Sequence, residues 1–133
     1  MSSTLTVTNL TATNLTDGGG TTSTFANINQ GHSKAWVNFN GTGTVAIRDS
    51  QNVSSLTDLS SANYTINFSN NFSAADYSFS GLAGVGAASG NYYFATPFNS
   101  APAVGSFSIR ISDFSGTITD VAYNAFNFHG DLA

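Results

Sequence analysis

The chain has 133 residues, no cysteine, 8% charged residues and a formal net charge of -4. Its length corresponds to one domain, which can bury roughly two thirds of its unfolded surface. Because the only cations are Lys34, Arg48 and Arg110, the chain lacks the clustered basic footprint of a nucleic-acid-binding protein. Without cysteine, neither a disulfide framework nor a thiolate metal site is expected.

The composition also predicts the class of fold. Ser, Thr, Asn and Gly fill most polar positions, β-branched and aromatic residues recur, and glutamate is absent. These preferences are typical of strands rather than helices, so we expect an all-β protein. The opening MSSTLTVTNL lacks a basic region followed by an apolar run, and no window approaches eighteen apolar residues. We therefore expect neither a signal peptide nor membrane insertion.

Residues 1–24 are predicted to form an extended N-terminal arm for assembly or attachment. Residues 2–24 contain no aromatic residue, and Thr-Asn-Leu-Thr occurs at 8–11 and again at 13–16. A five-residue step between leucines alternates their faces in a flat strand, which suits a segment covered by neighbours on both sides or a bulged strand. A disordered Thr-rich leader is the alternative. The candidate contact residues of the arm are Leu5, Val7, Leu10 and Leu15.

Residues 25–33 are expected to connect this arm to the main domain. The stretch 35–53 then alternates apolar and polar residues on both sides of Gly41-Thr42-Gly43, the pattern of a β-hairpin. Further alternating strands are predicted at 63–69, 77–80, 92–95, 106–112 and 117–129.

About seven or eight short strands near ten residues apart are typical of a β-sandwich or small jelly roll. We therefore predict an antiparallel β-sandwich or jelly-roll-like domain over residues 25–133. The Gly-rich stretch 81–90 is expected to be an exposed loop. The predicted core residues are Trp36, Phe39, Ile47, Tyr64, Ile66, Phe68, Phe107 and Ile109.

Catalytic and metal-binding patterns are weak, so we expect no enzymatic activity, no cofactor and no metal. The pattern Gly-x-Ser-x-Gly is missing, and His32 and His129 have no ligand spacing that indicates zinc. The aspartates fall mostly at predicted strand ends, where they serve turns. Gly41-Thr42-Gly43 lacks the Lys of a phosphate loop, and Asp17-Gly18-Gly19-Gly20 lacks the further acidic ligands of a calcium loop.

Exposed aromatic residues are the better candidates for binding, because they stack on sugar rings. Tyr92 and Tyr93 are adjacent in a predicted strand, so their side chains point to opposite faces. One of the two is expected to face solvent beside the Gly-rich loop. The predicted strand faces also lack the Lys residues that discourage edge pairing, which favours burial of the edges in an oligomer or a larger protein lattice.

Three stretches, AWVNFNGTGTVAIRDSQNVSS, NYTINF and the terminal HGDLA, resemble small β-rich virion proteins of tailed bacteriophages, especially aquatic ones. These proteins are described as tail-fibre or structural proteins. The similarity covers residues 34–80 and 126–133, less than half of the chain. The opening TLTVTNL also resembles the leader of such proteins, whereas residues 81–105 follow no pattern of the family.

The resemblance implies a trimeric virion component with neither enzymatic activity nor a cofactor. A tail fibre is the first expectation, because a leader followed by a compact β-domain has the layout of a fibre that is anchored at one end and recognises a host at the other. A capsid decoration protein that clamps capsid subunits through its arm is the alternative. The expected partners are copies of the chain in a homotrimer, other virion proteins and a host-surface glycan. A secreted carbohydrate-processing enzyme is disfavoured because no carboxylate pair is evident.

Overall fold

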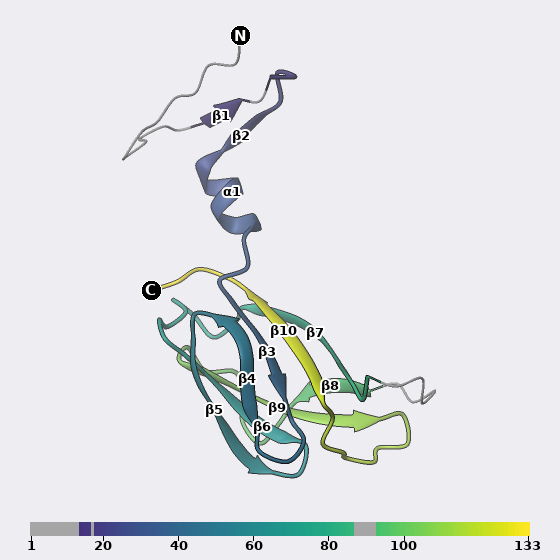
Figure 1. Cartoon of the computed structure of the whole chain (residues 1–133). Helices are drawn as coiled ribbons and strands as arrows, with labels where there is room; N and C mark the ends of the chain where they lie inside the picture. Colours follow the sequence, from purple (N-terminus) through teal and green to yellow (C-terminus); the bar gives the residue numbers. More distant parts are fainter. Residues whose placement is uncertain (1–13, 17, 87–92) are drawn as a thin grey trace. The chain divides into compact units, whose positions relative to one another are not determined.

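The computed structural model describes residues 14–16, 18–86 and 93–133 (Figure 1). The chain divides into two compact units, Met1–His32 and Ser33–Ala133. The sequence had placed this division after residue 24. In the part of the chain that the structure describes, no helix is long and apolar enough to cross a membrane.

The N-terminal unit contains a short hairpin and one helix. Strands β1 (Asn14–Thr16) and β2 (Thr22–Thr24) pair antiparallel, and helix α1 (Phe25–Gly31) follows directly. Thr24 caps the helix, since its hydroxyl accepts a hydrogen bond from the Asn27 amide at 3.0 Å. The predicted arm residues Leu5, Val7 and Leu10 lie outside the described residues. Most of the connector expected at 25–33 forms helix α1. The sequence signal for this helix is Thr24, a good N-cap residue directly before it.

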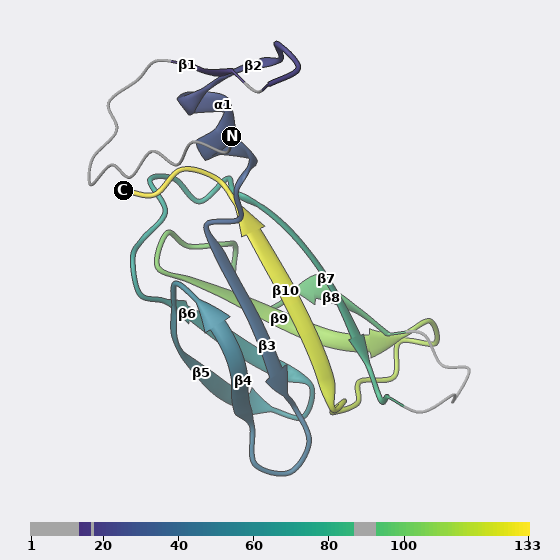
Figure 2. The same cartoon turned by 45° about the horizontal axis from the view of Figure 1, so that its top comes forward.

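The second unit is an antiparallel β-sandwich, as the strand spacing predicted. The eight strands in its described residues follow the order β4-β3-β10-β7-β8-β9-β6-β5. Among the described residues, Ala83 with Tyr93 is the pair that joins β7 to β8. The first four strands of this order and the last four form two layers (Figure 2). Figure 2 shows β3 and β10 side by side in one layer, with β9 and β6 behind them. The strands are β3 (Ala35–Asn40), β4 (Ala46–Gln51), β5 (Val53–Ser60), β6 (Asn63–Phe68), β7 (Ser78–Gly84), β8 (Tyr93–Pro97), β9 (Ser106–Asp113) and β10 (Tyr123–His129).

Strand alternation decides which side chains fill the space between the layers. Every second residue of β3, β6, β9 and β10 is buried, and together these strands supply most of the core. The predicted hairpin is confirmed as β3 paired with β4, and the predicted strands at 63–69 and 106–112 are confirmed as β6 and β9. Phe72, Tyr77 and Val121 complete the core from outside these strands.

The core is aromatic, and its rings interlock across the two layers. Phe128 of β10 contacts Phe68 of β6 edge-to-face, with ring centroids 5.1 Å apart, and Phe107 of β9 at 5.6 Å. Phe39 of β3 contacts Tyr64 of β6 at 5.1 Å. Such edge-to-face pairs contribute about 0.5–1.5 kcal/mol each beyond the burial of their area. The two layers are thus held together mainly by phenyl rings.

Six of the eight predicted core residues are buried: Phe39, Tyr64, Ile66, Phe68, Phe107 and Ile109. Ile47 is partly buried and packs against this core. The prediction for Trp36 is wrong. Its neighbours Ala35 and Val37 face the core, so period-two alternation places Trp36 on the outer face of the same layer, where it is half-buried.

The loop expected at 81–90 begins later than predicted. Strand β7 continues through Gly84, because Gly81 pairs with Phe126 in the sheet. A Cβ atom at position 81 would lie 2.1 Å from the Phe126 ring, so only glycine fits there. Glycine in this strand therefore marks a close approach to a packed ring rather than a loop.

Replacing Phe39 by Ala should lower the free energy of unfolding by about 3–5 kcal/mol, since it leaves a cavity in the core. Replacing Trp36 by Ala should cost only about 1 kcal/mol, because its side chain lies outside the core and forms a single hydrogen bond, to Gln51. Urea denaturation of both variants measures the two losses. Equal losses would contradict the outward position of Trp36.

Candidate interaction surface

The outer face of the layer β4-β3-β10-β7 combines aromatic, amide and apolar side chains. Cross-strand pairing sets Asn127 of β10 opposite Trp36 of β3, and Ala125 between Asn38 of β3 and Leu82 of β7. Leu82 is 78% exposed and Tyr123, at the start of β10, is 54% exposed. Large apolar side chains at such exposure are typical of interaction surfaces when they gather in one place.

A surface hollow of about 300 Å3 lies on this face, and we call it the β7–β10 hollow. Apart from Asn38 and Asn124, the residues that line it carry apolar side chains or none. Gly86, at a φ of 74°, packs directly against the ring of Tyr123, and a Cβ there would lie 2.1 Å from that ring. The lining residues are Asn38, Leu82, Ala83, Gly84, Gly86, Tyr123, Asn124 and Ala125.

Arg48 is a positively charged residue at the side of the β7–β10 hollow. The register of β3 and β4 shifts between Asn38 and Phe39, so Arg48 is the extra residue of a β-bulge. Its guanidinium donates hydrogen bonds to Asn38 Oδ1 at 3.2 Å and to the Phe39 carbonyl at 3.0 Å. It also lies 4.7 Å from the centroid of the Tyr123 ring, which is a cation–π contact.

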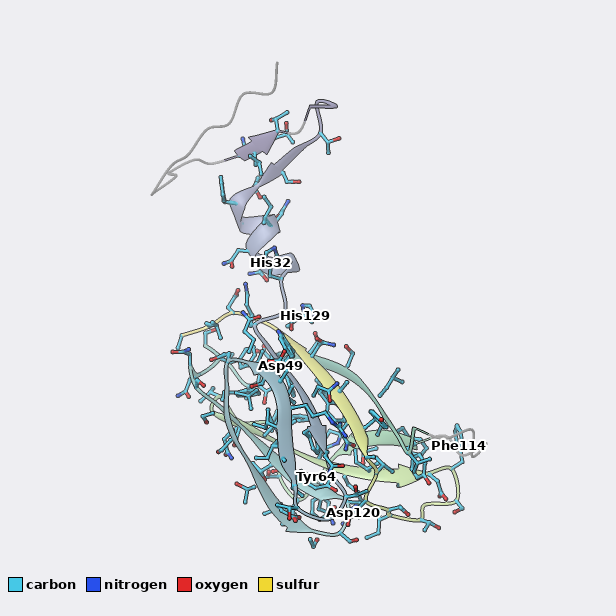
Figure 3. All side chains as sticks on the ribbon, in the orientation of Figure 1. His32, Asp49, Tyr64, Phe114, Asp120 and His129 are labelled. Carbon is cyan, nitrogen blue, oxygen red and sulfur yellow. The ribbon has the colours of Figure 1, made fainter. Side chains whose placement is uncertain are left out.

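A second exposed apolar feature is Phe114, in the turn that follows β9. Phe114 is 80% exposed, and its ring contacts that of Phe94 at a centroid distance of 5.3 Å. Ser112 pairs with both Phe94 and Ile118, so these side chains gather on one outer face. We call Phe94, Phe114 and Ile118 the Phe114 patch. Figure 3 shows Phe114 at one end of the sandwich, away from Tyr64 and Asp120.

Asp113 fixes the turn that carries Phe114. Its Oδ1 accepts hydrogen bonds from the Ser115 amide and the Thr117 amide, each at 2.9 Å, and from the Ser115 hydroxyl at 2.6 Å. Gly116 supplies the positive φ of 83°. The Ser115 hydroxyl and these backbone amides lower the pKa of Asp113, so it is an anion at neutral pH. The turn therefore displays an exposed phenyl ring beside a negative charge.

The outer face of the other layer is polar where β5, β6 and β9 lie side by side. Thr65 and Ser108 share a hydrogen bond at 2.8 Å, and Asn67 donates to hydroxyls of Ser55 and Thr57 at 3.1 Å each. Hydroxyl and amide side chains that form hydrogen bonds with one another in this way are typical of an antiparallel sheet with one face exposed to water. The Phe114 patch lies beyond these polar groups, on the part of the same layer formed by β8 and the end of β9.

Asp120 has a structural role in the described domain. Its Oδ1 accepts hydrogen bonds from the Ala62 amide at 2.6 Å and the Tyr64 hydroxyl at 2.7 Å. Burial, followed by this hydrogen bond and the nearby negative charge, raises the pKa of Tyr64 well above 10. Figure 3 places Asp49 toward the opposite end of the domain, so these two carboxylates do not form a pair.

No group of three metal-ligating side chains occurs in residues 14–16, 18–86 and 93–133. Asp113 binds the Ser115 amide in the turn after β9, which confirms its predicted use in a turn. Asp49 lies inside β4 and binds the Ser50 amide, so it does not serve a turn. A polar hollow of about 470 Å3 includes Asp76, His129 and Asp131 in its lining. These three do not meet the geometry of a metal group.

The predicted contact residues are not the ones the structure exposes most. Tyr92 lies outside the described residues, and Tyr93 is partly buried against the core, so Tyr93 is not an exposed contact. Leu15 of β1 is 52% exposed. The sequence analysis missed Phe114, although a phenylalanine inside the turn sequence Asp-Phe-Ser-Gly, where polar residues are usual, was a usable signal.

Comparison with protein-family models, curated proteins and solved structures finds no match to this chain. The similarity to virion proteins of tailed phages therefore stays a prediction.

Replacing Asp120 by Asn should lower the free energy of unfolding by about 1–3 kcal/mol, because its two hydrogen bonds would then go to a neutral amide oxygen, a weaker acceptor than a carboxylate. The matched control is Asp76→Asn, which changes the net charge equally at an exposed position. Urea denaturation measures both. Equal midpoints for the two variants would rule out the structural role of Asp120.

Stability should fall as the pH rises above about 10. Burial raises the pKa of Tyr77 to about 12 and that of Tyr64 further, whereas both ionise near 10.0 in the unfolded chain. The folded state then binds more protons than the unfolded state in this range, so stability decreases with pH. Urea midpoints at pH 8 and pH 11 measure this loss of stability. The midpoint of a Tyr77→Phe variant should fall less between the two pH values, because the variant lacks one of the two buried hydroxyls. A midpoint that does not move would contradict it.

Proposed function

We propose that this chain is a structural protein of a tailed-phage virion, most simply a tail-fibre component that acts in assembly and host-surface attachment without catalysis. The proposed partners are further copies of the chain in a homotrimer, other virion proteins and a host-surface glycan. The proposal starts from the sequence resemblance. The division of the chain into a well-packed sandwich and a separate N-terminal unit supports it.

The observation that carries the proposal is the lack of a core in the described part of the N-terminal unit. None of the seven residues of α1 is buried, and Leu15 is 52% exposed. Phe25, Ala26 and Ile28 line an open hollow of about 490 Å3 on the helix. A seven-residue helix is marginal by itself. A segment of this kind gains its stability when another protein covers its apolar side chains, as an anchoring segment in a virion would be covered.

The sandwich supports an attachment role rather than catalysis. Asp113 and Asp120 bind backbone amides, and Asp120 also binds the Tyr64 hydroxyl, so these two carboxylates serve to hold the backbone. The outer face of β4, β3 and β10 offers aromatic, amide and guanidinium groups, which are those of Trp36, Asn38, Arg48 and Tyr123. Such groups recognise the apolar faces and hydroxyls of sugars.

The second candidate function is capsid decoration. The same coreless N-terminal unit favours it, because a short segment with exposed apolar residues can clamp neighbouring capsid subunits. The two functions place the protein at different parts of a particle, so one localisation experiment separates them.

Deleting residues 1–32 should leave the sandwich folded and abolish its incorporation into particles. The expected readout is gold-labelled antibody against the sandwich, applied to purified particles that carry either the full or the shortened chain. Label should appear at the tail fibres of particles with the full chain and should be absent from the others.

Three results would count against parts of this proposal. Uniform label on the head would replace the tail fibre by the decoration function. Equal labelling of both particle types would show that the N-terminal unit is not the anchor. Absence of label from particles that carry the full chain would reject a virion role altogether.

A further inference from the structure

The Phe114 patch and the β7–β10 hollow lie on different parts of the sandwich and have complementary properties. The patch projects a phenyl ring that is 80% exposed, and the hollow offers about 300 Å3 of mostly apolar space. An apolar cavity of roughly 150 Å3 already accommodates a benzene molecule. The hollow is therefore large enough for a phenyl ring.

We propose that Phe114 of one copy of this chain inserts into the β7–β10 hollow of a second copy, against Leu82 and Tyr123. The occupant is a second copy because one chain carries both the projecting ring and a hollow that fits it. Leu82, at 78% exposed, and Tyr123, at 54%, would be covered in the same contact.

The charged groups beside the Phe114 patch and beside the β7–β10 hollow have opposite signs, which favours the proposed contact. Asp113 adjoins Phe114 in the turn, and Arg48 lies over the Tyr123 ring at the side of the hollow. In the proposed contact the carboxylate approaches the guanidinium, which favours this orientation over one that brings two copies of the same patch together. Asp49 is the carboxylate next to Arg48 in the sequence. It lies opposite Asn38 in the register of β3 and β4, and its Oδ1 accepts a hydrogen bond from the Ser50 amide at 2.8 Å.

The way the turn is held makes Phe114 a suitable anchor. Three hydrogen bonds to Asp113 Oδ1 and the positive φ of Gly116 fix the backbone on both sides of the ring. A side chain displayed on a fixed turn loses little conformational freedom on burial. Aromatic anchors that enter a pocket carry much of the affinity of protein interfaces.

The contact joins two different patches, so it is heterologous unless two copies exchange it about a two-fold axis. Heterologous contacts close into rings or continue as filaments, according to the rotation between copies. A ring of three rests on the proposed function, in which the fibre is a homotrimer. The contact itself does not depend on that function.

Because the chain has no cysteine, engineered cysteines can test the contact without interference. Two single variants, Phe114→Cys and Leu82→Cys, carry tags of different length and are mixed under mild oxidation. A mixed disulfide between two chains should form at least tenfold faster than in a mixture of Phe114→Cys with Leu59→Cys. Leu59 is the matched control, since it is a leucine on β5 that is 47% exposed.

Light scattering provides the second readout. The full chain should run as an oligomer, Phe114→Ser should weaken association at least tenfold, and Leu59→Ser should not. Circular dichroism should show that Phe114→Ser remains folded, because the ring is mostly exposed. If this variant does not fold, Leu82→Ser takes its place.

The proposal is overturned if the mixed disulfide forms no faster than the control, or if the full chain is a folded monomer at micromolar concentration. It is also overturned if Phe114→Ser leaves the oligomer intact. A variant that keeps its oligomer but no longer enters particles would assign the Phe114 patch to another virion protein. That result rejects the contact between copies and retains the proposed function, whereas labelling of particles tests the function independently of the contact.

Discussion

The structure depends on the packing of phenyl rings between two antiparallel layers. Phe128 contacts rings from both β6 and β9, and Phe39 contacts Tyr64 across the same space. This packing requires strict alternation along β3, β6, β9 and β10, because a shift of one residue would move every ring to the outer face. Gly81 and Asp120 serve the same core, since one leaves room for Phe126 and the other holds the Tyr64 hydroxyl.

The same alternation determines what the outside of the protein can do. With the aromatic residues of β6 and β9 directed inward, the outer face of their layer retains hydroxyl and amide groups that bond to one another. The other layer presents Trp36, Leu82 and Tyr123 instead. Exposed apolar groups also occur at Phe94, Phe114 and Ile118, beside β8 and β9, so both layers carry them. Such groups on a domain with few charges are typical of interaction surfaces.

Much of the fold could be predicted from the sequence, because alternation at period two reports directly on which side of a strand is buried. It located β3, β6 and β9, and most of the core. Trp36 was misplaced because aromatic character was given more weight than its position between Ala35 and Val37. Helix α1 was missed because seven residues are too few for a clear 3.6-residue period. Phe114, Leu82 and Tyr123 could not be grouped from the sequence, since that grouping depends on which strands become neighbours.

The most direct measurement is a density map, at side-chain resolution, of the fibre of a tailed phage that carries this chain. The account predicts sandwiches grouped in threes, with the ring of Phe114 from each copy covered by Leu82 and Tyr123 of the next, and with the N-terminal units buried among other proteins. Single sandwiches whose Phe114 and N-terminal unit both face solvent would contradict it.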